Sequence, residues 1–393
     1  MEGRYDVIVI GGGVSGCSTA FFLASDPGFD GRILVVERDP TYQDAPSARA
    51  TGGIRQQFST PENVRIGLFG SHFVKNAGDY LAIDGESPDL AWREGGYLLL
   101  ATPETLPIMR ENNAVQRSEG ADIALLTAPE LERKFGWLNT EGIAGGCNGL
   151  SGEGWVDPYS LLQAFRRKAR SLGVEFVHDE ALGATRSGSR VQSVTLRQGG
   201  EIVAGAVVNA AGASGVKEIA DSVGIDLPIE SRKRFTFVFE CRERVEPVPL
   251  TILPEGIGFR PEGRTFLVNR APPPEADPPT RDTDIDYDQF EEHIWPDLAA
   301  RVPAFEAIRL ASAWCCHYDL NTLDENAIVG SPPGLENFYV LTGFSGHGLQ
   351  QSPAMGRAVS ELIVHGEYRT LDLRRLGYER VLAGEPLVES NCF

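Results

Sequence analysis

The sequence has few cysteines, and their spacing is unlike that of zinc sites or disulfide frameworks. No two of them form a CxxC pair, and they stand at Cys17, Cys147, Cys241, Cys315, Cys316 and Cys392. Structural zinc sites and small disulfide-bonded domains both need closely spaced or paired cysteines. We therefore expect no metal site and no disulfide scaffold, and we expect a reducing compartment.

Long apolar runs are also lacking. No stretch approaches the roughly 18 consecutive apolar residues that a membrane-spanning helix requires. The first apolar stretch, residues 5–10, has no basic region before it, which favours a strand over a secretory signal. The sequence therefore predicts no membrane span and a cytoplasmic location.

Positive charge is scarce. The chain has 36 basic and 55 acidic residues, a formal net charge of −19, and no lysine after Lys233. Such a field opposes binding to nucleic acid or to an anionic membrane. With 393 residues, of which 42% are hydrophobic, the chain is long enough for two or three domains with a substantial core. A small-molecule substrate is the expected partner.

The chain opens with an apolar segment, residues 5–10, that runs directly into the pattern GGGVSG at residues 11–16. A strand that ends in this pattern turns tightly, approaches a pyrophosphate without interference from Cβ atoms, and begins a helix whose amides face the anion. A second apolar segment, residues 33–36, ends at Glu37, 21 residues after Gly16. An acid at this distance accepts hydrogen bonds from the ribose of a dinucleotide and repels a 2′-phosphate. The opening therefore predicts a dinucleotide site.

Three later segments extend this site. Residues 47–53 are small, which lets a flat ligand lie against the backbone, and residues 207–212 form a predicted strand that ends in small residues. A strand over 338–342 leads into the glycine turn 343–348 and a predicted helix over 350–364. The start of this helix would stabilise negative charge on a bound cofactor.

The intervening segments predict a second domain, with strands over 97–101, 235–241, 257–260 and 265–269. We predict an α/β fold whose Rossmann-like domain comprises residues 1–90, 150–215 and 325–393. The inserted domain, α+β with an antiparallel sheet, comprises residues 91–149 and 216–324. The proline-rich segment 272–279 is interpreted as a solvated linker.

Together these motifs resemble the D-amino-acid oxidase superfamily of FAD-dependent oxidoreductases, which includes sarcosine oxidases, dimethylglycine dehydrogenases and glycine oxidase. The most specific are the opening glycine pattern with Glu37, GWVDP at 154–158, NAAG at 209–212, and GFSGHG at 343–348 with Pro353. Residues 52–63 and 314–330 are most similar to the FAD-dependent oxidoreductase domain-containing branch, which includes a complex I assembly flavoprotein.

The resemblance implies an FAD-binding domain and a substrate bound between the flavin and the sheet of the inserted domain. The pyrophosphate would lie on the first glycine turn, the ribose at Glu37, the adenine at the backbone of Leu182, and the flavin pyrimidine edge at the turn before the last helix. The residues assigned to FAD in this way are Gly11, Gly13, Val14, Ser15, Gly16, Glu37, Arg38, Ala48, Thr51, Gly52, Leu182, Ala211, Gly212, Gly346, His347, Gly348, Leu349 and Gln350.

The substrate-binding residues depart from those of the sarcosine-type relatives. These relatives bind the substrate carboxylate with a lysine where this chain has Gln350, and they use a lysine beside the flavin to activate oxygen. Arg55 and Arg260 are the candidate cations here, and His347 is a candidate proton acceptor or hydrogen-bond partner. The alternatives are a structural hydrogen bond for His347 and a salt bridge for Arg55.

Covalent attachment of the flavin is not expected. Some relatives attach it through a histidine beside the small-residue loop, and residues 48–53 contain no histidine. Others use a cysteine near the position of Cys315 and Cys316. For these adjacent cysteines the alternative interpretation is packing as small buried residues.

The leading functional prediction is oxidation of an amine, an amino acid or N-methyl amino acid, by hydride transfer from a C–H bond to flavin N5. One alternative is oxidation of a 2-hydroxy acid on the same flavin. Another is a flavoprotein whose main role is in assembly or interaction. The electron acceptor, oxygen or a redox partner, stays open.

Overall fold

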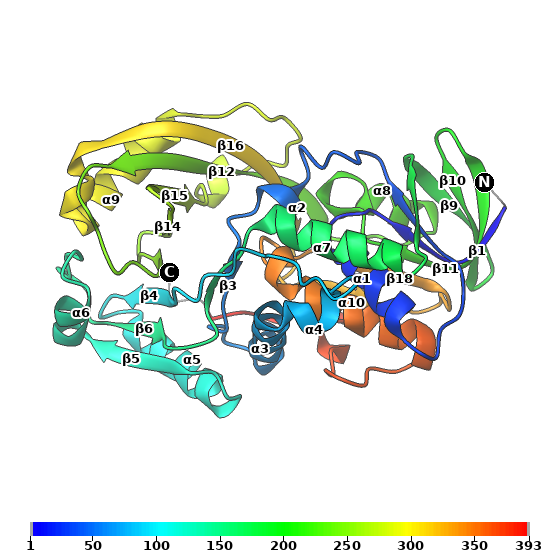
Figure 1. The fold of residues 1–393 in the computed structure, drawn as a ribbon, viewed down its shortest axis with the longest axis horizontal. Helices are drawn as coiled ribbons and strands as arrows, with labels where there is room; N and C mark the ends of the chain where they lie inside the picture. The colour runs from blue at the N-terminus through cyan, green and yellow to red at the C-terminus, as the bar shows by residue number, and fades with distance from the viewer. Residues whose placement is uncertain (1–2, 391–393) are drawn as a thin grey trace.

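The computed structural model describes residues 3–390, which form two lobes, each built on a large sheet (Figure 1). The nucleotide domain has the strand order β17-β18-β11-β1-β2-β8, and the hairpin β9–β10 extends it from β11. The sheet domain has the order β16-β12-β15-β14-β13-β4-β6-β5. Two short strands, β3 (Gly53–Ile54) and β7 (Gly154–Trp155), pair with each other. The predicted α/β fold with an inserted sheet domain is confirmed.

The centre of the nucleotide sheet is parallel. β1 lies between β11 and β2, with Val9 opposite both Val208 and Val35, so the carboxyl ends of these strands share one edge. Their apolar runs are buried on both faces, as expected when helices cover a parallel sheet. The strands are β1 (Arg4–Ile10), β2 (Ile33–Glu37), β8 (Glu175–His178), β9 (Ala181–Ser187), β10 (Arg190–Leu196), β11 (Gly200–Asn209), β17 (Ile328–Gly330) and β18 (Phe338–Thr342).

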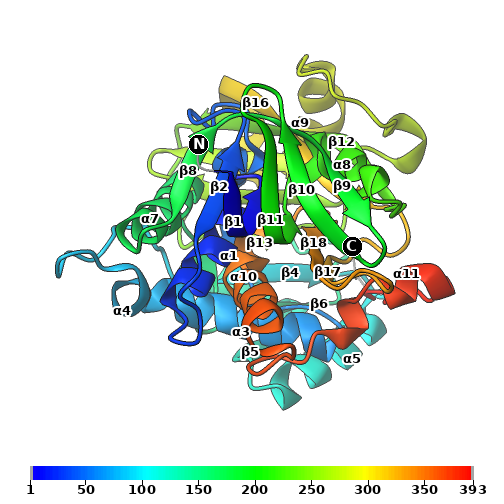
Figure 2. The same ribbon diagram turned by 90° about the vertical axis from the view of Figure 1, so that its right-hand side faces the viewer.

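Helices cover both faces of this sheet (Figure 2). One face packs against α1 (Val14–Ser25), α7 (Pro158–Ser171) and α10 (Gly348–His365), and the other packs against α8 (Val216–Ser222). Asp157 caps α7 by accepting a hydrogen bond of 2.7 Å from the Ser160 amide, which fixes the start of this helix. The remaining helices near this domain are α2 (Pro46–Arg49), α3 (Pro61–Lys75), α4 (Ala77–Leu81) and α11 (Glu379–Ala383).

The sheet domain is antiparallel except for one pair. β4 and β13 run parallel, because β4 comes from the first inserted segment and β13 from the second, and the two segments join at this pair. The strands are β4 (Tyr97–Ala101), β5 (Ile123–Thr127), β6 (Gly145–Gly149), β12 (Ile229–Cys241), β13 (Leu250–Ile252), β14 (Ile257–Glu262), β15 (Thr265–Arg270) and β16 (Ile308–Asn321). Its helices are α5 (Leu106–Ser118), α6 (Ala128–Lys134) and α9 (Trp295–Arg301).

One predicted domain boundary is too early. Residues 216–228 were predicted to begin the second part of the inserted domain, but Val216, Ile219 and Ala220 are buried against the nucleotide sheet. The sheet domain resumes at Ile229, where β12 begins. The apolar face of α8 explains the difference, because it packs against β9 and β11.

The proline-rich segment is anchored and is not a free linker. Asp277, 8% exposed, accepts hydrogen bonds from both terminal nitrogens of Arg234 on β12, at 2.7 and 2.8 Å. These bonds hold the segment against the sheet, which sequence composition does not reveal.

Within residues 3–390, no helix is long and apolar enough to cross a membrane, and no group of three or more His, Cys, Asp or Glu side chains is placed to hold a metal ion. Cys17, Cys241, Cys315 and Cys316 are free thiols, and Cys392 lies outside the described residues.

Candidate active site

A cavity of 730 Å³ is lined by both domains. The edge of the nucleotide sheet where the parallel strands end forms one side, and strands β12 to β16 form the other. Its lining includes seven arginines and six carboxylates, although the whole chain carries a net charge of −19. The cavity is therefore far less negative than the protein around it, which suits an anionic ligand.

The first glycine turn forms one end of the cavity. Gly11 has a φ of +98°, and a Cβ atom at Gly16 would lie 1.9 Å from the Gly11 carbonyl oxygen. Gly16 therefore lets α1 pack directly on the turn and does not itself line the cavity, whereas Gly11, Gly13, Val14 and Ser15 do. The N-cap residue of α1, Gly13, provides no side-chain cap, and Ser47 Oγ accepts a hydrogen bond of 3.1 Å from the Val14 amide at the helix start, whose partial positive charge favours an anion.

Glu37 joins this turn to the end of β2. Its Oε2 accepts a hydrogen bond of 2.7 Å from the Gly12 amide, and its Oε1 accepts one of 2.8 Å from the Asp39 amide. Burial is the main cause that raises the pKa of this carboxyl, and the two amide hydrogen bonds oppose it. Glu37 and Arg38 both line the cavity, where Glu37 is available to accept hydrogen bonds from a ribose.

Leu182, whose backbone is predicted to contact the adenine, lies next to the cavity in the chain. Asp179, Glu180 and Ala181 line the cavity, whereas Leu182 is not part of the lining and is 48% exposed. Ala211 and Gly212 line the cavity as predicted, and a Cβ atom at Gly212 would meet no atom within 4 Å.

The second glycine turn, residues 343–348, forms the other end of the cavity. Asp319, at the end of β16, accepts hydrogen bonds from the Gly343 amide at 2.7 Å and from the Thr342 hydroxyl at 3.1 Å. α10 then begins at Gly348, with His347 as an N-cap residue that makes no side-chain cap bond. Residues 346–350 all line the cavity, where they join Thr51 and Gly52. Ala48 faces the hydrophobic core instead, and its neighbours Ser47 and Arg49 line the cavity.

These features fit a dinucleotide. Two helices of more than eight residues, α1 and α10, begin at the cavity, and each helix start carries partial positive charge. Between them lie the ribose acid Glu37, the small residues Ala211 and Gly212, and the short loop at Thr51 and Gly52. An extended ligand with a diphosphate at one end and a flat ring at the other matches this sequence of contacts.

Arg55 and His347 meet at the end of the cavity that the second glycine turn forms. Arg55, 8% exposed, donates from Nη2 to His347 Nε2 at 2.9 Å, and its guanidinium lies 4.6 Å from the centre of the Phe58 ring. Desolvation and the positive charge of Arg55 together lower the pKa of His347 to about 3, although a hydrogen bond to the Phe344 backbone opposes both. The imidazole is therefore neutral at physiological pH, accepts a hydrogen bond at Nε2, and is a weak base. It suits the predicted role of hydrogen-bond partner better than that of proton acceptor.

Gln350 has a structural role at the position where sarcosine-type relatives carry lysine. It is 4% exposed, and its Oε1 accepts a hydrogen bond of 2.8 Å from the backbone amide of Arg55. The side chain thus holds the Arg55 backbone against the start of α10. Gln350 therefore supplies no positive charge itself, but it anchors the segment that carries the Arg55 cation.

Arg260 is engaged by the protein itself. Its Nε donates to the Thr51 carbonyl at 2.7 Å, and its Nη1 donates to the Pro261 carbonyl at 3.0 Å and pairs with Glu262. Burial lowers the pKa of this guanidinium, and Glu262 opposes that effect. Arg260 lines the cavity, as predicted, but its bonds tie the sheet domain to the loop at Thr51. Arg55, which lines the cavity and contacts His347, is the other candidate for binding a substrate anion.

Cys316 lines the cavity and Cys315 does not. Burial raises the pKa of the Cys316 thiol to about 12. Since the thiolate is the reactive form, this environment disfavours covalent chemistry at Cys316.

Sequence reasoning missed several residues. Tyr97 and Tyr318 both line the cavity: the Tyr97 hydroxyl would lie 2.0 Å from a Cβ atom at Gly53, and the Tyr318 ring would lie 2.6 Å from one at Gly346. The buried Glu153 accepts hydrogen bonds from the Gln56 amide at 2.6 Å and from Gln57 Nε2 at 2.8 Å. Gly53 and Gly346 are the sequence feature that could have indicated these tyrosines, because each glycine leaves room for a tyrosine ring from the other domain.

Comparisons with known proteins agree with this geometry. The family model described as "FAD dependent oxidoreductase", DAO, matches residues 6–362. FAD-dependent oxidoreductase domain-containing protein 1 of Xenopus laevis is 41% identical over 99% of this chain and 85% of its own length. Sarcosine oxidase subunit beta of Rhizobium meliloti is 25% identical over 92% of this chain and 85% of its own length.

Among solved structures, L-proline dehydrogenase from P. horikoshii superposes with a TM-score of 0.86 and 25% identity, and the match covers 98% of this chain and 100% of that one. Family, fold and cavity thus agree on the cofactor as well as on the architecture. The chain belongs to the DAO family of FAD-dependent oxidoreductases, with FAD as its cofactor.

Proposed function

We propose that this protein oxidises an amine that carries a carboxylate, an amino acid or N-methyl amino acid. The observation that carries the proposal is the Arg55–His347 pair at 2.9 Å, beside the open start of α10 in the cavity. When bound, FAD supplies the chemistry, because flavin N5 accepts a hydride from a C–H bond. The names of two relatives, sarcosine oxidase subunit beta and L-proline dehydrogenase, support this substrate class.

The chain's own residues orient the substrate. Arg55 presents guanidinium N–H donors in a partly desolvated site, where a bidentate pair with a carboxylate is strong and directional. The imidazole of His347, uncharged because its pKa is about 3, accepts from one of these donors and fixes the plane of the guanidinium. Tyr97 and Tyr318, on opposite halves of the sheet, also line the cavity and would contact a bound substrate.

The test is an anaerobic screen for bleaching of the flavin spectrum. Sarcosine, L-proline, other N-methyl and primary amino acids, and D- and L-lactate are added to the holoprotein, and photoreduction serves as the control that the flavin can be reduced. We expect bleaching by at least one amino acid and not by lactate. Bleaching by lactate alone would replace the amine with a 2-hydroxy acid. No bleaching by any compound, together with a partner that co-purifies stably, would favour the interaction role.

A further inference from the structure

Residues 387–390, here called the strap, run from α11 towards α3 and α5. The Leu387 amide donates to Asp324 Oδ2 at 2.9 Å, and its carbonyl accepts from Asn326 Nδ2 at 2.6 Å. At the other end, the Ser390 amide donates to Ser59 Oγ at 2.7 Å, and its carbonyl accepts from Asn112 Nδ2 at 2.6 Å. The strap is thus bonded to both domains.

The Glu389 side chain makes the densest contacts of the strap. Its Oε2 accepts from the Ser59 amide at 2.6 Å and from the Ser59 hydroxyl at 2.7 Å. Its Oε1 accepts from the Thr60 amide at 3.3 Å, from Asn63 Nδ2 at 2.6 Å, and from the Thr60 hydroxyl. Thr60 is the N-cap residue of α3 but makes no cap bond of its own, so Glu389 adds negative charge at this helix start to that of Glu62 in the first turn.

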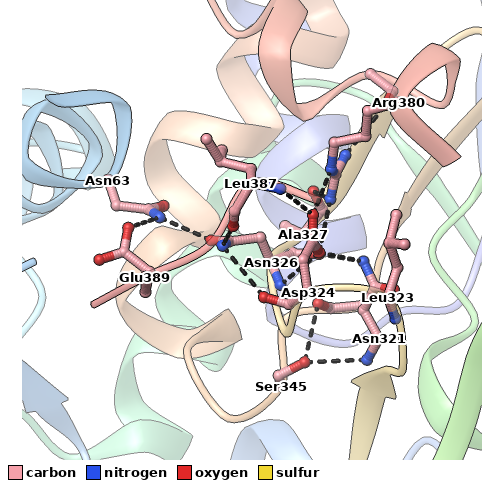
Figure 3. A network of polar contacts seen from close by, with 12 residues as sticks. Asn63, Asn321, Leu323, Asp324, Asn326, Ala327, Ser345, Arg380, Leu387 and Glu389 are labelled. Atoms are coloured by element: carbon pink, nitrogen blue, oxygen red, sulfur yellow. Dashed lines mark hydrogen bonds and ion pairs between the residues drawn. The ribbon is translucent and has the colours of Figure 1, made fainter. Parts of the chain in front are cut away.

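A network joins this carboxylate to the second glycine turn (Figure 3). Asn63 Nδ2 also donates to Asn326 Oδ1 at 2.7 Å, and Asn321 Nδ2 donates to the Asn326 carbonyl at 2.6 Å. The Asn321 backbone amide donates to Ser345 Oγ at 3.0 Å, and Ser345 lies two residues before His347. Asp324 and Arg380 form the base of the network through a bond of 2.7 Å. The strap therefore reaches the segments that carry both Arg55 and His347.

The backbone between Arg55 and α3 has no regular structure and is held by side chains. The Arg55 amide bonds Gln350, the Gln56 amide bonds Glu153, and the Phe58 carbonyl accepts from Gln116 Nε2 at 3.0 Å. Glu389 holds the last two residues of this segment, 59 and 60. Each anchor comes from a different part of the chain, and Glu389 is the one that comes from the strap.

We infer that Glu389 is a positioning residue for the substrate site. It does not line the cavity, and it acts by fixing residues 59 and 60 so that Arg55 stays in contact with His347. The inference rests on the proposed function for its kinetic consequence alone, since the order of the backbone can be measured without a substrate.

The test is Glu389→Ala, which leaves a space the size of a carboxylate group among five donors. We expect normal FAD content, but at least tenfold faster amide hydrogen exchange over residues 55–64, and at least tenfold weaker binding of benzoate, measured by its perturbation of the flavin spectrum. Added acetate should restore both properties, whereas acetamide, or sodium chloride at the same ionic strength, should not. Glu385→Ala is the matched control, because it removes an exposed carboxylate from the same end of the chain.

Two further variants test whether Glu389 acts through Arg55. Adding Glu389→Ala to Arg55→Ala should weaken benzoate binding no further than Arg55→Ala does. Glu389→Gln, which fills the space, should show the same defects without rescue by acetate, and it replaces the alanine variant should that variant not fold. Unchanged exchange over 55–64, or equal rescue by acetate and acetamide, would overturn the inference. If no amine reduces the wild-type flavin, the proposed function fails, and hydrogen exchange still decides the role of Glu389.

Discussion

The two ends of the cavity are built in different ways. At the nucleotide end, the Gly12 amide and Glu37 bond each other across a separation of 25 residues, within one strand–helix–strand unit. At the other end, beside the second glycine turn and here called the substrate end, the Arg55 amide bonds Gln350 across 295 residues. The Gln56 amide bonds Glu153 across 97 residues. The nucleotide end is thus fixed by local sequence, whereas the substrate end depends on long-range packing.

This difference has a consequence for mutation. A change in the strand–helix–strand unit should weaken cofactor binding, so that no flavin is present to react at the substrate end. A change in a long-range anchor should leave FAD bound but alter how a substrate is positioned beside the flavin.

The largest effect is expected for Gly16→Ala. The added Cβ atom would lie 1.9 Å from the Gly11 carbonyl oxygen, and neither backbone can give way without moving α1 from the turn. We expect purified protein with almost no FAD by absorbance, or none in the soluble fraction. Gly3→Ala, where a Cβ atom would meet nothing within 4 Å, is the control and should keep its flavin. Full FAD content in the Gly16 variant would show that the turn is wrongly described.

Glu37→Ala should have the next largest effect. It removes an acceptor for the ribose and the bond that holds the Gly12 amide, a loss of about 1.5 to 3 kcal/mol. FAD should therefore bind about ten- to a hundredfold more weakly, as measured by titration of the apoprotein. Glu175→Ala, an exposed acid on β8, should bind FAD normally. Equal affinity in wild type and Glu37→Ala would place the ribose elsewhere.

Glu153→Gln tests a long-range anchor through pH. Burial raises the pKa of Glu153 to about 7, so the folded protein binds more protons than the unfolded chain between pH 4.5 and 7. The wild type therefore loses stability across this window as pH rises, by about 3 kcal/mol for a shift of this size. The Tm of Glu153→Gln minus that of the wild type should rise between pH 4.5 and 7. A difference that stays level or falls would mean that Glu153 is ionised throughout.

The smallest effect is expected at the cysteines. Because the Cys316 thiol has a pKa of about 12 and Cys315 does not line the cavity, acid precipitation should release all of the flavin. Cys316→Ser should retain FAD like the wild type. Flavin that stays in the pellet, and that Cys316→Ser releases, would demonstrate a covalent link.

How much the sequence predicts follows the same division. The glycine turn, Glu37, the second glycine turn and the two-domain fold are predictable, because each motif is contiguous and its function needs only neighbouring backbone. The roles of Gln350, Glu153 and Glu389 are not, since a buried amide or acid is indistinguishable in sequence from one on the surface. Leu182 and Ala48 are predicted near the cofactor but are not part of the cavity lining, because the sequence does not show which residues of a strand or short helix face a cavity.

The two arginines illustrate the limit most clearly. Arg55 and Arg260 are equivalent candidates in the sequence, and only the structure separates them. Arg260 is bonded to Thr51, Pro261 and Glu262, whereas Arg55 faces His347 beside the start of α10.

The central claim is that Arg55 anchors a substrate carboxylate, and the most direct measurement is anaerobic flavin reduction by the best amino acid in Arg55→Ala. Loss of the anchor in a partly desolvated site costs roughly 2 to 5 kcal/mol, so we predict at least about tenfold weaker apparent affinity with normal FAD content. Arg244→Ala, in which an exposed arginine is removed, should match the wild type. Unchanged affinity in Arg55→Ala would contradict the account and leave a neutral amine, or a role without catalysis, as the better explanation.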